Sequence, residues 1–485
     1  MSMLDILSLL NLKIAFIQQN QIFFRTLIYH TYSLSAYSNY MIELQAFHYI
    51  ETLTCINKIR KEVYMKTKNE LKATQDNIDI GFLQINTLSK TNQIPIPNAT
   101  IQIASSGNPN ITIEEITTNA DGQTENIELA APPIEYSLEP SDNQPYSEYN
   151  LKISAPGYED AIISGVQILS GENGLQNIRM TPSTEPQAYN PTVIGGHTLW
   201  EFYPPKIAEA EIKPTNESGE IVLSKVVVPE YIIVHDGTPS DTTAIDYYVS
   251  YRDYIKNVAS CEIYATWPES TIYANVLAIM SFTLNRVFTE WYRGKGYDFT
   301  ITSSTAFDHK WIPQKTIYKN ISQIVDSVFA NYLSRPNVLQ PILTQYCDGK
   351  RVTCPNWMSQ WGSKYLGDQG YTAIEIIRNY YGDDMYINEA EQIAGIPASW
   401  PGYDLSIGAS GPKVRMMQEQ LNRIAQNYPS IPRIAVDGSF GEATKDAVEQ
   451  FQRIFNLPVT GIVDYPTWYK ISQIYVGVSR IAELN

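Results

Sequence analysis

The sequence predicts a multidomain α+β protein, with a β-sandwich followed by an α+β middle domain and a small three-helix domain. Its 485 residues are enough for about three domains of roughly 150 residues each. From about Gly81, short runs such as TIQIA and NLKIS alternate apolar and polar residues, which is typical of strands. Near the C-terminus, apolar residues instead recur at helical spacing, which predicts amphipathic helices.

The first segment, residues 1–79, is apolar but has no basic start, clean apolar core or small-residue cleavage site. It therefore does not fit a secretory signal. Two interpretations stay open. Translation begins at Met65, or the segment is a removable pro-segment or an amphipathic docking helix.

Charge and cysteine content limit the partners. The net charge is −16 and the pI about 4.9, and an acidic surface repels phosphate backbones, so we expect no nucleic-acid partner. No run of 18 or more apolar residues occurs, so no membrane span is expected. Four cysteines in so long a chain do not form a disulfide scaffold.

Residues 80–180 carry the strand-like runs, separated by turn signals at Asp121-Gly122 and Pro156-Gly157. This order resembles the carboxypeptidase regulatory-like or prealbumin-like β-sandwich, which implies a spacer or adhesive module. Residues 181–196 are rich in Pro, Ser, Thr and Gly and are predicted to be a linker.

Residues 404–480 contain two apolar stripes, one through Val414, Met417, Leu421 and Ile424, and one through Ala447, Val448, Phe451 and Phe455. Asp464 is the expected N-cap of a third helix, with Pro466 in its first turn. The string around VDGSFGEATKDAVEQFQ resembles the peptidoglycan-binding type 1 domain, a three-helix module. The resemblance implies that peptidoglycan glycan strands are a partner.

The middle domain, residues 197–395, holds two motifs that are far apart in the chain. The stretch YRDYIKNVASCEIYATWPES and the later WMSQWGSKYLGDQG resemble the stage II sporulation protein D family of lytic transglycosylases. Glu262 falls on the family's catalytic glutamate. The resemblance implies substrate contacts from Tyr264, Trp267, Ser359, Gln360 and Trp361.

Some positions depart from the family pattern. Tyr273, Asn275 and Met280 stand where the family has Lys, Gln and Arg, and Cys354 stands near its usual His. These departures put the family's helper residues in doubt for this chain.

The domain order is similar to that of germination-specific spore cortex-lytic enzymes. That resemblance implies a zymogen activated by a germination protease. It also implies a location in the spore cortex and coat region or the cell wall, outside the cytoplasm.

Glu262 has the residue type and setting of a general acid. Hydrolysis of a glycosidic bond usually needs two carboxylates, and no second one stands beside Glu262 in the sequence. A lytic transglycosylase needs one glutamic acid, because the C6 hydroxyl of muramic acid is the nucleophile. Burial beside Tyr264 and Trp267 would favour the protonated acid by desolvating the anion.

Several alternatives remain. Glu262 can be a solvated helix residue; Gln360 can cap a helix while Trp361 fills a core. An N-acetylmuramidase using water, or an inactive wall-binding protein, would keep the same domains. No cofactor is expected.

The cysteines of the middle domain leave further alternatives open. Cys347 and Cys354 can form a loop disulfide or, with His309, part of a zinc site, although their spacing fits structural zinc poorly. Cys261 is a weak candidate nucleophile, with His235 as a remote partner.

Overall fold

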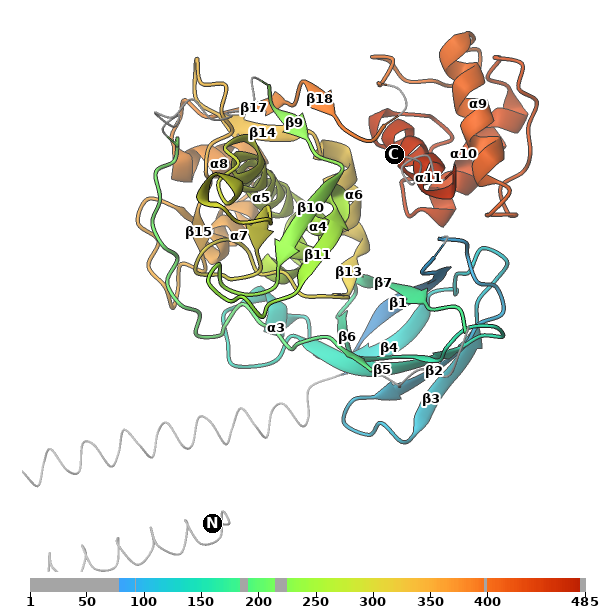
Figure 1. Ribbon diagram of the computed structural model, residues 1–485. Helices are drawn as coiled ribbons and strands as arrows, with labels where there is room; N and C mark the ends of the chain where they lie inside the picture. Colours follow the sequence, from blue (N-terminus) through green and yellow to red (C-terminus); the bar gives the residue numbers. More distant parts are fainter. Residues whose placement is uncertain (1–77, 92, 184–190, 214–224, 397–398, 480–485) are drawn as a thin grey trace, which may run out of the picture. The chain divides into compact units, whose positions relative to one another are not determined.

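The computed structural model describes residues 78–91, 93–183, 191–213, 225–396 and 399–479 (Figure 1). The predictions for the leader, including a start at Met65, lie outside these residues, as does part of the predicted linker, residues 184–190. The described chain has several sheets and a helical C-terminal region. The predicted mixed α+β organisation is therefore confirmed, whereas the particular sandwich family stays a prediction.

The N-terminal part of the described chain consists of two sheets with a shared apolar core. One has the strand order β3-β2-β5-β6-β8 and the other β13-β7-β1-β4. Alternate residues of the strands, such as Leu83, Ile85 and Ile101, are fully buried, as the alternation in the sequence predicts. The elements are β1 (Asp79–Ser89), β2 (Thr100–Ser105), β3 (Thr112–Thr117), β4 (Ile127–Ala131), α3 (Glu135–Leu138), β5 (Tyr146–Ser154), β6 (Ala161–Leu169), β7 (Asn173–Met180) and β8 (Thr192–Val193).

Part of the predicted linker joins this sheet. Thr192–Val193 form β8, which pairs in parallel with β6, and Ile194 beside it is buried. The difference from the predicted linker is explained by Thr192–Ile194, a run of three β-branched residues inside a Pro-rich stretch. Such residues favour a strand, and here they add one to the sheet and bury a side chain.

The middle domain is built around α5 (Glu269–Phe288), which is buried along most of its length. Pro268 is its N-cap residue, and Glu269 places a negative charge in the first turn, where the helix dipole favours it. The other elements are β9 (Val227–Val228), β10 (Tyr231–His235), β11 (Asp246–Ser250), α4 (Tyr251–Glu262), η1 (Arg293–Lys295), β12 (Ile301–Thr302), β13 (Ile317–Tyr318), α6 (Lys319–Val328), β14 (Asn331–Ser334), β15 (Tyr346–Cys347), β16 (Met358–Ser359), α7 (Gln360–Asp368), α8 (Ala373–Tyr381), β17 (Tyr386–Glu389) and β18 (Gln392–Ile393).

Short sheets place the loops of this domain. Strands β10, β11 and β12 form one sheet, and the pairs β14–β17, β15–β16 and β9–β18 form others. Strand β13 pairs with β7, so that a middle-domain segment extends a sheet of the N-terminal part. Helices α4 and α5 lie behind β10 and β11 (Figure 1), and the short pair β15–β16 leads into α7.

The C-terminal region contains α9 (Pro412–Ile424), α10 (Glu442–Ile454) and α11 (Tyr465–Ser479). The predicted stripe residues Val414, Met417 and Leu421 are buried. The Asp464 carboxylate accepts the N–H of Thr467 at 3.0 Å, which confirms the predicted cap.

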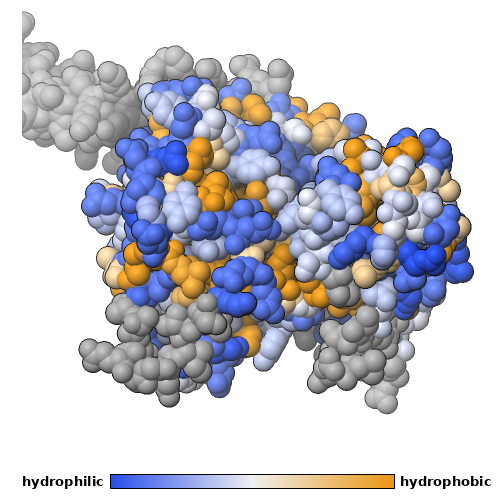
Figure 2. All heavy atoms as spheres, turned by 90° about the horizontal axis from the view of Figure 1, so that it is seen from above, coloured by the Kyte–Doolittle hydropathy of each residue, from blue (hydrophilic) through white to orange (hydrophobic). Residues whose placement is uncertain are grey.

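The surface is mixed. In the face that Figure 2 shows, hydrophobic residues are interspersed among hydrophilic ones. Within the described ranges, no helix is both long and apolar enough to cross a membrane.

Candidate functional site

Glu262 is the last residue of α4, and its side chain is buried at 7% exposure. Ser250 starts this helix by accepting the N–H of Asp253 at 3.3 Å. The C-terminal end of a helix carries partial negative charge, so a carboxylate there needs hydrogen-bond donors. The solvated-helix interpretation of Glu262 does not fit this burial.

The donors come from two distant segments, and the first is Gln360 at the start of α7. Its amide Nε2 donates to the Glu262 carboxylate at 2.8 Å and to the Glu262 backbone carbonyl at 2.7 Å. Gln360 is itself 4% exposed. The two motifs that lie 98 residues apart therefore meet at one buried carboxylate.

The second donor is the backbone N–H of Lys310, which lies 2.7 Å from the other carboxylate oxygen. Asn257, on α4, fixes the loop that presents it. The Asn257 amide donates to the Ile312 carbonyl at 2.8 Å and accepts the Ile312 N–H at 3.2 Å. Sequence reasoning missed this contact, because a backbone donor leaves no trace in residue identity.

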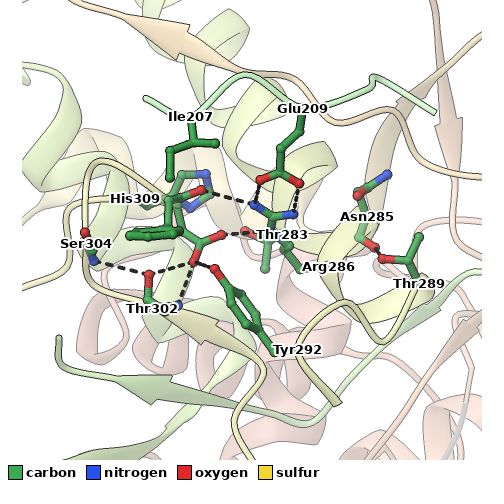
Figure 3. A network of polar contacts seen from close by, with 12 residues as sticks. Ile207, Glu209, Thr283, Asn285, Arg286, Thr289, Tyr292, Thr302, Ser304 and His309 are labelled. Carbon is green, nitrogen blue, oxygen red and sulfur yellow. Dashed lines mark hydrogen bonds and ion pairs between the residues drawn. The ribbon is translucent and has the colours of Figure 1, made fainter. Parts of the chain in front are cut away.

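A buried ion-pair network holds the same loop from the other side (Figure 3). Arg286, on α5, donates from Nε to Asp308 at 2.7 Å and from both terminal nitrogens to Glu209 at 2.9 and 2.7 Å. The second Asp308 oxygen accepts from the Tyr292 hydroxyl at 2.6 Å and from Thr302 at 2.9 and 2.7 Å. Asp308 is fully buried, one of its oxygens is ion-paired with Arg286 and the other accepts three hydrogen bonds, which leaves Asp308 poorly suited to act as a second catalytic carboxylate.

The predicted aromatic contacts form a cluster behind the glutamate. Trp267 and Trp361 have ring centroids 4.9 Å apart, and Tyr264 lies edge-on to both at 5.8 and 6.1 Å. The three side chains are buried. In this structure they pack as a core, which agrees with the alternative that Trp361 fills a core. Their contact with a sugar stays a prediction.

Ser359, not Gln360, caps α7. Its hydroxyl accepts the Gly362 N–H at 2.9 Å and donates to the Asp348 carbonyl at 3.2 Å. This hydrogen bonding gives Ser359 a structural role, and its contact with substrate stays a prediction.

The cysteine alternatives separate clearly. Cys347 and Cys354 form a disulfide, so neither thiolate is free for a metal. His309 is fully buried between aromatic rings, with Nδ1 3.1 Å from the Tyr254 hydroxyl. Among the described residues, no group of three His, Cys, Asp or Glu side chains could hold a metal ion.

Cys261 is buried, and burial raises the pKa of its thiol to about 11. A thiol that stays protonated is a poor nucleophile. His235, its suggested partner, instead holds Asp246 at 2.7 Å. A cysteine nucleophile is therefore not supported.

Two further residues near Glu262 come from the segment just after the predicted linker. Burial raises the pKa of Tyr203 and lowers that of Lys206, and the charge of Glu262 acts on both groups. The ammonium of Lys206 also donates to the backbone carbonyls of Thr305 and Asp308. In the sequence, the only distinctive feature beside Tyr203 and Lys206 is the pair Pro204-Pro205, and a Pro-Pro pair does not identify a functional site.

Comparisons with known proteins concern parts of the chain. Residues 410–471 match the family described as "Putative peptidoglycan binding domain". A zinc D-Ala-D-Ala carboxypeptidase of Streptomyces albus G is 43% identical over 77 residues, which are 16% of this chain and 28% of that protein. The chain thus spans little more than a quarter of the length of this curated relative.

Among solved structures, the SleB N-terminal domain is similar at 30% identity and a TM-score of 0.14, over 16% of this chain and 99% of that one. The 5-hydroxyisourate hydrolase of Klebsiella pneumoniae is similar at 18% identity and a TM-score of 0.15, over 21% and 91% of the two chains. At these TM-scores neither likeness carries an argument.

The family match confirms the predicted peptidoglycan-binding domain within residues 404–480. It indicates a cell-wall-related protein with peptidoglycan as a partner.

Proposed function

We propose that this protein cleaves the glycan backbone of peptidoglycan, at the bond from N-acetylmuramic acid to N-acetylglucosamine, as a lytic transglycosylase. The observation that carries the proposal is the buried Glu262 carboxylate, held by Gln360 and the Lys310 N–H. Two donors fix its orientation, and each oxygen keeps a further lone pair that can carry a proton.

Glu262 acts first as acid and then as base. Its proton passes to the bridging oxygen while the bond from that oxygen to C1 of muramic acid breaks. The C6 hydroxyl of the same sugar bonds to C1, and its proton returns to Glu262. The products are a 1,6-anhydro-muramic end and a free N-acetylglucosamine hydroxyl, and no water is consumed.

One carboxylate is sufficient for this reaction because the nucleophile belongs to the substrate. Its effective molarity is on the order of 10⁵ M or more. The hydrogen bonding of Asp308 supports this choice over a muramidase, since a hydrolase needs a second carboxylate for water or for a covalent intermediate.

The biological setting is proposed from the resemblance and from the peptidoglycan-binding segment. The enzyme acts outside the cytoplasm, on the cortex of germinating spores or on the cell wall. It is made as a zymogen and activated by a germination protease.

The test compares the parent, Glu262→Gln and Glu269→Gln on purified cortex sacculi. Glu269 is an exposed glutamate seven positions further along and serves as the matched control. Each protein is assayed intact and after limited proteolysis, since a zymogen would be silent. Products are reduced with borohydride and analysed by mass spectrometry.

We expect anhydro-muramic ends from the parent and from Glu269→Gln. Loss of a general acid should slow Glu262→Gln by about 10²–10⁴-fold. Reducible muramic ends would establish the muramidase instead. Binding to sacculi without release from any form would indicate an inactive wall-binding protein.

A further inference from the structure

Residues 197–213, here called the strap, cross the middle domain without forming a helix or strand. They are held by hydrogen bonds to the domain beneath. The Leu199 N–H donates to the Tyr264 hydroxyl at 2.9 Å, and the Ile207 N–H donates to the Ala306 carbonyl at 2.8 Å. The strap is therefore an irregular segment seated on the domain that carries Glu262.

The strap runs beside Glu262. Glu262 is 7% exposed. The ring nitrogen Nε2 of His197, in the strap, lies 2.7 Å from the backbone carbonyl of Cys261, and the Lys206 ammonium donates to the backbone carbonyl of Asp308, two residues before the Lys310 donor. A glycosidic oxygen must come within about 2.6–3.2 Å of its proton donor. At 7% exposure Glu262 admits no sugar to that distance, so a neighbouring segment has to move before substrate binds.

The strap seat, meaning the residues beneath the strap, is rich in groups that recognise amides. Gln345 donates to the Ile207 carbonyl at 2.7 Å and accepts the Glu209 N–H at 2.9 Å. Gln340 accepts the Lys213 N–H at 2.7 Å. The acetamido groups of peptidoglycan sugars offer the same N–H and C=O as these backbone amides.

The seat also offers an aromatic face and two cations. The Lys206 ammonium lies 4.8 Å from the centroid of the Tyr346 ring, a face on which a sugar ring could stack. Arg286 binds Glu209 (Figure 3). Arg335 binds Glu211 through two bonds of 2.8 and 2.9 Å. Muramic acid carries a lactyl carboxylate, the group that guanidinium binds best.

We propose that the strap seat is the substrate-binding site for an N-acetylated glycan bearing carboxylates, and that the strap is its intramolecular occupant. This inference rests on the proposed function. Backbone amides of the strap stand in for acetamido groups, and Glu209 and Glu211 stand in for lactyl carboxylates. Glycan and strap therefore compete for one site.

The experiment measures this competition by hydrogen–deuterium exchange of the full-length Glu262→Gln protein, which binds without turnover. Purified glycan strands freed of their peptides are the probe, and N-acetylglucosamine hexamer, which lacks carboxylates, is the comparison. We expect the amides of residues 203–213 to exchange at least about tenfold faster with the glycan strands, and less so with the hexamer. Unchanged exchange of the strap, at concentrations that protect residues 410–471, would overturn the proposal.

A second arm weakens the strap from its own side. Glu209→Gln/Glu211→Gln removes two carboxylates that meet arginines, and Glu114→Gln/Glu128→Gln removes two exposed ones from the N-terminal sheets. In protein that retains Glu262, we expect Glu209→Gln/Glu211→Gln to speed hydrogen exchange of the strap and to raise the rate of sacculus lysis by about tenfold. The second pair should change neither. A looser strap with no faster lysis would contradict the proposal.

The two arms separate this inference from the proposed function. If glycan releases the strap but the protein never lyses sacculi, the proposed binding site stands and the proposed reaction is refuted. If lysis depends on Glu262 but glycan does not move the strap, the proposed reaction stands and the proposed binding site is refuted.

Discussion

Replacing Gln360 by alanine tests whether the two motifs act as one site. The amide of Gln360 is the group that joins α7 to Glu262, through bonds of 2.8 and 2.7 Å. It is buried, so no water replaces it without rearrangement. The substitution should therefore disturb both the stability of the middle domain and the position of the catalytic carboxylate.

The magnitude follows from the two lost bonds. A bond to a charged group contributes about 1.5–3 kcal/mol and a neutral one about 1 kcal/mol. We expect Gln360→Ala to lower the free energy of unfolding of the middle domain by about 2–4 kcal/mol. Loss of orientation at Glu262 should reduce the lysis rate by about 10–100-fold.

The assay follows the slowest-exchanging amides of α5, which report the opening of the core that contains this helix. Gln369→Ala, at an exposed position that follows the same helix, is the control and should change stability by less than about 0.5 kcal/mol. A double-mutant cycle with Glu262→Gln isolates the contact, and a coupling of about 1–2 kcal/mol is expected.

Two results would refute the reasoning. One is an additive cycle, which would mean that Gln360 stabilises α7 without acting on Glu262. The other is a variant with full lysis activity despite the expected loss of stability.

Three further predictions concern other buried groups. Asp326→Ala should lower the free energy of unfolding by about 3–5 kcal/mol, measured by denaturant titration, because Lys256 at 2.7 Å and other buried cations lose their anion. Burial raises the pKa of Glu172 from 4.5 to about 7, so its contribution to stability is full below about pH 4.5 and is lost as pH rises through 7. Glu172→Gln should therefore be more stable than the parent at pH 8, by about 1–3 kcal/mol, and equal to it at pH 4; equal melting curves at pH 8 would contradict this. Cys347→Ser/Cys354→Ser opens a short loop and should cost about 2–3 kcal/mol, with unchanged melting as the contrary result.

The sequence predicted the features that depend on local patterns. The apolar stripes of α9 and α10 and the cap at Asp464 follow from spacing and residue type, and the structure contains them. It also selected Glu262 and Gln360 for one site by resemblance, although nothing in their spacing implied a direct contact.

What the sequence could not predict depends on long-range packing. The Lys310 donor belongs to the backbone, and Asn257 positions its loop by bonding Ile312, 55 residues further along the chain. The packing of Trp267 against Trp361 could not be predicted either, because an aromatic side chain fits a core and a sugar site equally well by type alone. The strap has no periodic pattern, because its conformation is imposed by its seat.

The network at Arg286 suggests how the site survives the departure of the strap. Glu209 binds the two terminal nitrogens of Arg286, whereas Asp308 binds Nε and keeps its bonds from Tyr292 and Thr302. When Glu209 leaves, Asp308 therefore remains anchored, and with it the loop that presents the Lys310 N–H. Opening would expose Glu262 and free the Nη1 nitrogen of Arg286 for substrate, while Nη2 keeps its bond of 3.1 Å to the Phe307 carbonyl and the donors that orient the acid stay in place.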